Sequence, residues 1–128
     1  MARIIVIEDE AAIRRLINRI LARSGHEVRE AKNGRDGVAL HRDDPADLVI
    51  TDVFMPEQDG IETIRQIREF APDTPIIAMS GGGARGGGDS LESAQAIGAQ
   101  AVMQKPFSPD ELERVVRALL GAQSPRLE

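Results

Sequence analysis

The amino-acid sequence predicts an α/β fold: a doubly wound, five-stranded parallel sheet in the order 2-1-3-4-5, with five helices over both faces. Short apolar runs rich in β-branched residues alternate with stretches in which apolar residues recur at helical spacing. Such alternation forms parallel sheets with right-handed crossover helices. The second run, residues 27–30, is half polar and belongs at a sheet edge, whereas the other runs are apolar enough to be buried on both faces.

The first half of the chain contains two expected strands and two expected helices. Residues 4–7 form the first strand and residues 27–30 the second. Gly25 suits the left-handed position that follows a helix, Asn33 can cap the second helix, and Pro45 stops it. The first helix presents one apolar face, formed by Ile13, Leu16, Ile17, Ile20 and Leu21.

The second half continues the alternation with three more apolar strands, each followed by a helix. The strands are expected at residues 48–52, 76–79 and 101–103, and the helices begin at Asp59, Asp89 and Ser108. Ser108 is followed by proline at the first helical position and by glutamate at the third, which is a strong helix start. Six of the eight residues 81–88 are glycine, so this segment is expected to be a pliable connector.

The length favours a single domain, residues 1–121, followed by a C-terminal tail, residues 122–128. Gly121 ends the last helical stripe, and Leu127-Glu128 is compatible with a cloning remnant. The chain has no cysteine, which excludes disulfides and thiol chemistry. Its two histidines are too few and too scattered for a typical zinc site.

Charge and hydropathy narrow the expected partners. Acids outnumber bases 21 to 16, which argues against direct binding of nucleic acid. Glu8 interrupts the first apolar run before a signal-peptide core could form, and no run reaches the ~20 residues of a membrane helix. We therefore expect a cytoplasmic protein that does not bind membranes.

The residues with chemistry to offer all lie at the ends of predicted strands. Glu8 and Asp9 follow the first strand, Asp52 ends the third, Ser80 ends the fourth and Lys105 follows the fifth. Parallel strands bring these ends to one edge of the sheet, where ligands bind in open α/β folds. Carboxylates placed so closely repel each other, so one takes a proton or a hard cation binds, and oxygen ligands favour Mg²⁺. Carboxylate, cation, ammonium and hydroxyl together suit phosphoryl transfer onto Asp52.

On these motifs the sequence resembles the receiver domains of two-component response regulators, in particular single-domain, chemotaxis-regulator-like receivers. The resemblance spans essentially residues 3–121 and implies a flavodoxin-like fold. Any one motif is weak, but all of them in order at the right strand ends are highly specific. The matching motifs are Glu8-Asp9, Asp52 followed by Met55-Pro56, Ser80 after Ile-Ile-Ala-Met, and Lys105-Pro106-Phe107.

The resemblance implies a role for each site residue. Asp52 would be the phospho-acceptor, Lys105 would pair with the phosphate across a cis Lys105-Pro106 peptide, and Ser80 would be the switch hydroxyl. The phosphoryl group would come from a sensor histidine kinase or a histidine phosphotransfer protein, and the output would be binding to a downstream partner protein. The implied Mg²⁺ ligands are Glu8 (directly or through water), Asp9, Asp52 and the backbone carbonyl of Phe54.

Two features depart from the family pattern. The family usually carries Tyr or Phe three residues before the lysine, as a rotamer switch, and this chain has Val102 there and no tyrosine at all. The glycine-rich segment 81–88 follows Ser80 directly. We therefore expect the response to phosphorylation to be an ordering of this segment and of the fourth helix.

Other interpretations of the same residues stay open. Glu8 and Asp9 also suit the first turn of a helix, whose dipole favours acids. The receiver could belong to a longer DNA-binding regulator. An aspartyl-phosphate phosphatase needs a second aspartate two positions after the nucleophile, where this chain has Phe54. A flavin-binding module on this fold needs a hydroxyl-rich phosphate loop after the first strand, where this chain has acids.

We expect a protein that catalyses its own phosphorylation and is not a turnover enzyme. Arginines at 15, 19 and 23 form either a solvated helix face or a docking surface for the phosphodonor.

Overall fold

The computed structural model describes residues 2–53, 60–80 and 98–122. In this part of the chain five strands form one sheet in the order β2-β1-β3-β4-β5, and every neighbouring pair is parallel. The expected α/β fold and strand order are confirmed. The elements are β1 (Arg3–Ile7), α1 (Ala11–Arg23), β2 (Glu27–Ala31), α2 (Gly34–Asp43), β3 (Leu48–Asp52), α3 (Gly60–Phe70), β4 (Ile76–Ser80), β5 (Ala101–Gln104) and α5 (Pro109–Ala122).

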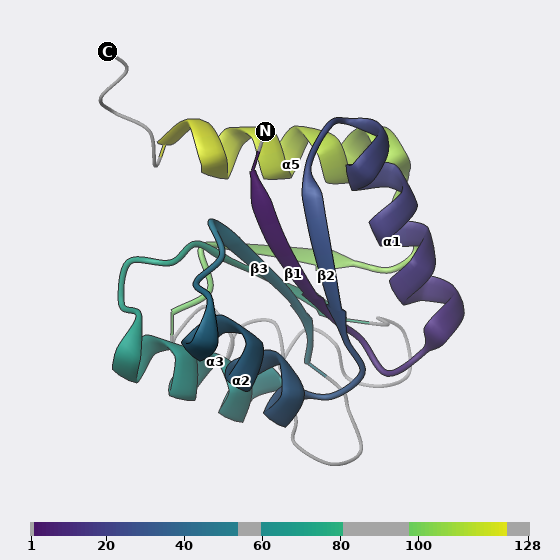
Figure 1. Ribbon diagram of the computed structural model, residues 1–128. Coiled ribbons are helices and arrows are strands. Elements are labelled where there is room, and N and C mark those ends of the chain that lie inside the picture. Colours follow the sequence, from purple (N-terminus) through teal and green to yellow (C-terminus); the bar gives the residue numbers. More distant parts are fainter. Residues whose placement is uncertain (1, 54–59, 81–97, 123–128) are drawn as a thin grey trace.

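Helices cover both faces of the sheet, as Figure 1 shows: α1 and α5 lie on one face, and α2 and α3 on the other. Successive side chains along each strand point to opposite faces of the sheet and pack into two separate apolar layers. In β1, Ile4 and Val6 pack with α1 and α5, whereas Ile5 and Ile7 pack with α2 and α3. The central strands β3 and β4 are buried along their whole length, whereas the half-polar β2 lies at an edge, as expected.

Local sequence signals explain where the helices begin and end. The Asn33 side chain accepts a hydrogen bond from the Asp36 amide at 2.8 Å, and the Ser108 hydroxyl accepts one from the Glu111 amide at 3.0 Å. Both expected caps are therefore confirmed. Gly25 has a φ of 92°, the left-handed conformation that favours glycine after a helix.

Some predictions fall on residues that the structure does not describe. These are the cap at Asp59, the segment 81–88 and the fourth helix from Asp89, so the described residues contain four of the five expected helices. None of the described helices is both long and apolar enough to cross a membrane.

Candidate phosphoryl-transfer site

Three carboxylates meet at the carboxyl edge of the sheet. β1 and β3 are paired neighbours, so Glu8, which follows β1, comes close to Asp52 at the end of β3. Glu8 is 0% exposed and Asp52 is 4% exposed, whereas Asp9 is open to solvent. One oxygen from each of the three carboxylates lies within 4.8 Å of the others. The structure thus brings together the acids that the sequence placed at these two strand ends.

Lys105 reaches this acidic group from the far edge of the sheet. Its ammonium lies 2.9 Å from a Glu8 carboxylate oxygen and 3.2 Å from an Asp52 carboxylate oxygen. The Lys105 amide donates to the carbonyl of Ser80 at 2.7 Å, which anchors the residue just beyond the end of β5. The Lys105-Pro106 peptide is cis, as the resemblance implied. Lys105 therefore bridges the two buried acids.

Burial and charge set the protonation of this group. Burial raises the pKa of Glu8 to about 7, with a further upward contribution from the Asp52 charge, although the hydrogen bond from Lys105 opposes it. Burial also lowers the pKa of Lys105, but its hydrogen bond to Glu8 and the charge of Asp52 outweigh that effect and leave this pKa raised. Lys105 stays charged, while Glu8 can exchange a proton near neutrality.

Ser80 ends β4, the strand next to β3. Its neighbour Met79 is the register partner of Asp52, and the Val53 amide donates to the Met79 carbonyl at 2.8 Å. Ser80 is fully buried. The strand pairing therefore places a hydroxyl residue on the strand beside the Asp52 carboxylate. Phe54, whose carbonyl was expected to join the site, lies outside the described residues.

Val102 occupies the β5 position at which the family pattern has an aromatic ring. It pairs with Ala78 of β4 and is partly buried against the apolar layer that α2 and α3 cover. A valine side chain has one short χ angle and no ring to swing between inward and outward positions. Val102 therefore offers no aromatic rotamer switch, and the ordering expected at residues 81–88 stays a prediction.

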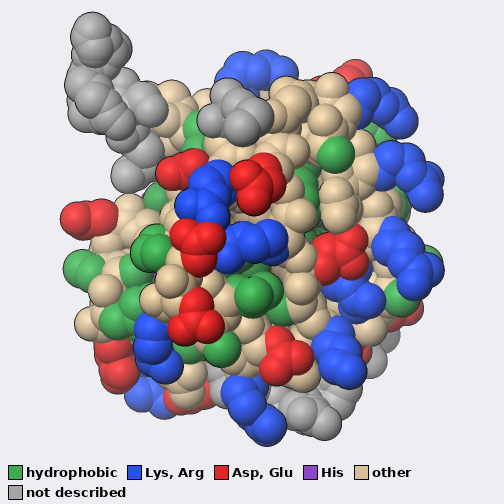
Figure 2. All heavy atoms as spheres, viewed as in Figure 1, with side chains coloured by type: hydrophobic (Ala, Val, Ile, Leu, Met, Phe, Trp, Pro, Cys, Tyr) green, Lys and Arg blue, Asp and Glu red, His purple; other side chains and the backbone are tan. Residues whose placement is uncertain are grey.

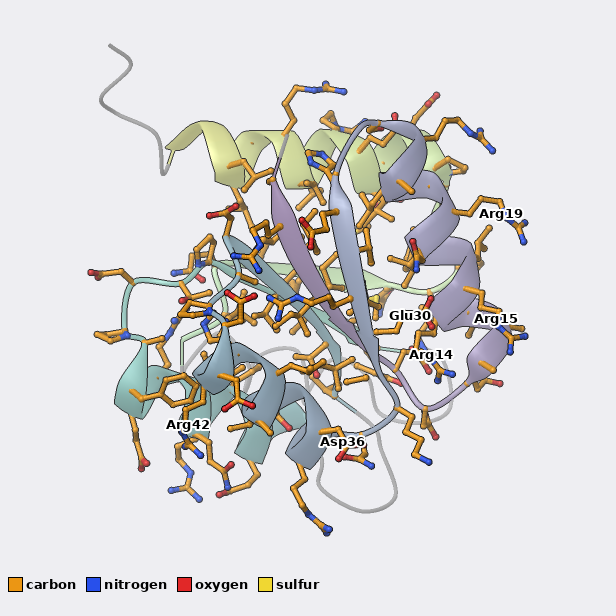
Figure 3. The ribbon with its side chains drawn as sticks, viewed as in Figure 1. Arg14, Arg15, Arg19, Glu30, Asp36 and Arg42 are labelled. Carbon is orange, nitrogen blue, oxygen red and sulfur yellow. The ribbon has the colours of Figure 1, made fainter. Side chains whose placement is uncertain are left out.

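A hydrogen-bond network that was not predicted from the sequence lies next to the acidic group. Arg14 of α1 donates to the backbone carbonyl of Glu8 at 2.8 Å and to the carboxylate of Glu30 on β2 at 2.9 Å. Figure 3 shows Arg14 and Glu30 side by side between α1 and β2, whereas Arg15 and Arg19 point away from the sheet. The sequence carries no periodic signal for this contact, because Arg14 stands beside the exposed Arg15 and Glu30 belongs to a half-polar edge strand.

The arrangement fits a divalent cation. With all three carboxylates ionised, the single ammonium of Lys105 leaves two negative charges in excess. Neither histidine nor cysteine belongs to the group, and oxygen ligands of this kind suit Mg²⁺. A carboxylate nucleophile, an ammonium and a cation site at one sheet edge are the parts that phosphoryl transfer needs.

The family model of the response regulator receiver domain matches residues 4–117. Among curated proteins, the transcriptional regulatory protein ResD of Bacillus subtilis is 40% identical over 95% of this chain, which spans 49% of ResD. The solved receiver domain of NtrX from Brucella abortus is 32% identical with a TM-score of 0.86 and covers 92% of this chain and 98% of its own. The chemotaxis protein CheY4 of Vibrio cholerae is 27% identical with a TM-score of 0.85, covering 93% and 98%. The chain spans about half the length of ResD and of the response regulator MprA of Mycolicibacterium vanbaalenii, two of the curated relatives it matches.

Proposed function

The chain belongs to the response regulator receiver domain family, and on that premise we propose that it accepts a phosphoryl group on Asp52 in a two-component phosphorelay. The donor is the phosphohistidine of a sensor kinase or of a histidine phosphotransfer protein. The phosphorylated chain then signals through a partner protein. In this role the protein promotes its own modification and is not a turnover enzyme.

One observation carries the proposal: the Lys105 ammonium lies between the carboxylates of Glu8 and Asp52, 2.9 Å from the first and 3.2 Å from the second. A buried acid at the end of an apolar strand is costly to keep. The ammonium offsets that cost. It also lies where it can pair with a phosphoryl group attached to Asp52. Asp52 is only 4% exposed, so its carboxylate depends on this ammonium for its charge partner.

The chemistry follows from these groups. A carboxylate oxygen of Asp52 attacks the phosphorus of phosphohistidine, a P–O bond forms, the P–N bond breaks, and the imidazole leaves with the electron pair and takes up a proton. Lys105 pairs with an oxygen of the transferred group, and the Ser80 hydroxyl can donate to another. Before transfer, Lys105 stabilises the ionised Asp52 that the attack requires.

Mg²⁺ would be held by Asp9 and Asp52, with Glu8 directly or through water and the Phe54 carbonyl as the remaining protein ligand. When bound, it supplies positive charge for the oxygens of the phosphoryl group. The oxygen-only donor set and the excess negative charge of the site support this choice of metal. Glu8, with a pKa of about 7, can lose its proton to meet the cation.

An apolar surface beside Lys105 supports docking of the phosphodonor at this edge of the sheet. Pro106 is exposed, Phe107 and Ile13 are half-buried, and Leu16 is 46% exposed, and together they border a depression of about 330 Å³ next to Lys105. Positive side chains line the edge of the molecule formed by α1 in Figure 2. Glu10 and Lys105 also line this depression, so it offers the phosphodonor an apolar contact flanked by one charge of each sign.

A second role is that of the receiver part of a longer transcriptional regulator. The observation in its favour is the 40% identity to ResD, of which this chain spans 49%. The site and its chemistry are the same in both roles, and only the output differs. The reading frame beyond residue 128 distinguishes them.

The proposed function is tested with a small phosphodonor such as acetyl phosphate. We expect the protein to gain one phosphoryl group that hydroxylamine removes, as an acyl phosphate requires, when Mg²⁺ is present and none when the metal is chelated. Asp52→Asn removes the nucleophile but keeps the size of the side chain, so it should not be labelled. Labelling of Asp52→Asn to the wild-type level would contradict the assignment.

A further inference from the structure

Arg14 holds the peptide bond that joins two of the acids. Its Nη1 donates to the backbone carbonyl of Glu8 at 2.8 Å, and that carbonyl belongs to the peptide between Glu8 and Asp9. The Glu8 amide donates to the Ala31 carbonyl of β2 at 3.0 Å. The chain is therefore fixed on both sides of the Glu8 Cα, at the point where it leaves β1.

Arg14 is itself held in place by β2 and α1. Its Nε donates to one carboxylate oxygen of Glu30 at 2.9 Å, and the Asn18 amide donates to the other at 2.6 Å. Asn18 lies one helical turn after Arg14 on α1, so both side chains reach β2 from the same helix face. The side chains of Arg14 and Glu30 are only 15% and 28% exposed, which distinguishes this pair from the surface ion pairs of the chain.

The three side chains thus form a chain of contacts from the edge strand to the acidic site. The hydrogen bond from Asn18, together with the hydrogen bond and the charge of Arg14, lowers the pKa of Glu30 although burial opposes this, so the ionised carboxylate continues to bind Arg14. None of the three side chains belongs to the acidic group that could hold a cation. Their contact with that group runs through the backbone of Glu8.

We propose that Arg14, held by Glu30 and Asn18, is a positioning residue for the cation site: it orients the Glu8–Asp9 peptide so that both acids face the position that Mg²⁺ takes. The proposal rests on the proposed function, because it assumes that the acidic group binds the metal. Outer contacts that orient metal ligands commonly change metal affinity by 10-fold or more when they are removed.

The direction in which Arg14→Met changes the Mg²⁺ affinity tests the proposal. Arg14 carries a positive charge close to the acids, so if it acted only through its charge, Arg14→Met would strengthen Mg²⁺ binding. If Arg14 positions the peptide, Arg14→Met weakens Mg²⁺ binding by about 10-fold despite the lost positive charge. Calorimetric titration with Mg²⁺ alone measures this, on protein whose folded state is verified by its thermal transition.

Matched variants separate positioning from other effects. Arg19→Met removes an exposed arginine of the same helix and should leave the Mg²⁺ affinity near the wild-type value. Asn18→Ala changes no charge and loosens Glu30, so it should weaken Mg²⁺ binding by less than Arg14→Met. Glu30→Gln combined with Arg14→Met should weaken Mg²⁺ binding by less than the sum of the two single effects, because both act through one contact.

A second readout follows the phosphoryl chemistry. The Mg²⁺ concentration that half-saturates the labelling of Asp52 should rise in Arg14→Met, while the labelling rate at saturating Mg²⁺ returns to the wild-type value. Equal or tighter Mg²⁺ binding by Arg14→Met, with binding intact in the wild type, would overturn the positioning role alone. A wild-type protein that binds no Mg²⁺ would overturn both this inference and the metal-dependent site.

Discussion

The ammonium of Lys105 lies 3.2 Å from the carboxylate of Asp52, although 53 positions separate the two residues in the sequence. The parallel order β1-β3-β4-β5 explains this proximity, because the carboxyl ends of all four strands open on the same edge. The same ammonium contacts Glu8, so one cation serves two buried acids. The acidic site is therefore organised around Lys105.

Removing the Lys105 ammonium should affect the Mg²⁺ affinity and the rate of Asp52 labelling in different ways. Lys105→Met leaves Glu8 and Asp52 without their shared partner, so we expect the free energy of unfolding without Mg²⁺ to fall by about 3 kcal/mol. Mg²⁺ should bind at least as tightly as in the wild type, because a competing positive charge is gone. The rate of Asp52 labelling should nevertheless fall by about 100-fold, since the transferred group loses its cation. Denaturant unfolding, calorimetry and labelling kinetics measure the three effects.

Lys32 provides the control for this substitution. It is the only other lysine of the chain and is exposed. Lys32→Met removes the same charge from the protein but should change neither stability nor labelling appreciably. Labelling of Lys105→Met at the wild-type rate would show that this ammonium does not stabilise the transferred phosphoryl group.

Gly60 packs closely against the backbone of Asp52 and Val53. A Cβ atom at Gly60 would clash with the Asp52 carbonyl and with the Cα of Val53, which are backbone atoms that cannot swing away. Gly60→Ala should therefore lower the free energy of unfolding by about 2 kcal/mol and slow the labelling of Asp52. Gly121→Ala is the matched control, because a Cβ there meets nothing within 4 Å, and it should not destabilise the protein. A Gly60→Ala protein with wild-type stability would contradict this close approach.

His41 should make the stability depend on pH. It is fully buried, its Nδ1 accepts from the Ala46 amide at 3.0 Å, and its Nε2 lies 3.0 Å from the Thr74 hydroxyl. Burial, together with the charges of Arg29 and Arg68, lowers its pKa below the ordinary value of 6.5. Neutral His41 therefore contributes stability that is fully present above pH 6.5 and is lost as the pH falls through the lowered pKa of the folded protein.

The measurement compares unfolding free energies of His41→Leu and its parent between pH 8 and pH 5. Both proteins should carry His26→Gln, so that the second histidine does not contribute. The carboxylates are common to the pair and cancel. The stability difference between the two should be largest above pH 7 and should shrink toward pH 5. A difference that stays constant over this range would mean that His41 is not held neutral by the fold.

Much of the fold could be predicted because local signals and the global arrangement agree. The half-polar residues 27–30 form the edge strand, and the cap at Asn33 fixes the start of α2. The site was also predictable in outline, because Glu8, Asp52, Ser80 and Lys105 all stand at strand ends, and a parallel sheet brings such ends together. For these residues the position in the chain already implied the position in space.

The contacts that could not be predicted depend on how helices lie on the sheet. Arg14 stands next to Arg15, and only the rotation of α1 on β2 turns Arg14 toward Glu30 and leaves Arg15 exposed. The buried state of His41 depends likewise on α2 packing against α3, whose Phe70 ring centroid lies 5.6 Å from that of His41. Neither contact leaves a periodic signal in the sequence, because each joins single residues from separate elements.

Asp52 is the residue that we propose carries the phosphoryl group. The most direct test of this proposal is to phosphorylate the protein with acetyl phosphate and Mg²⁺, reduce the acyl phosphate with borohydride, and map the product by peptide mass spectrometry. We expect position 52 alone to be converted from aspartate to homoserine, and only in samples that contained Mg²⁺. Conversion at Glu8, Asp9 or any other carboxylate, with position 52 unchanged, would contradict it.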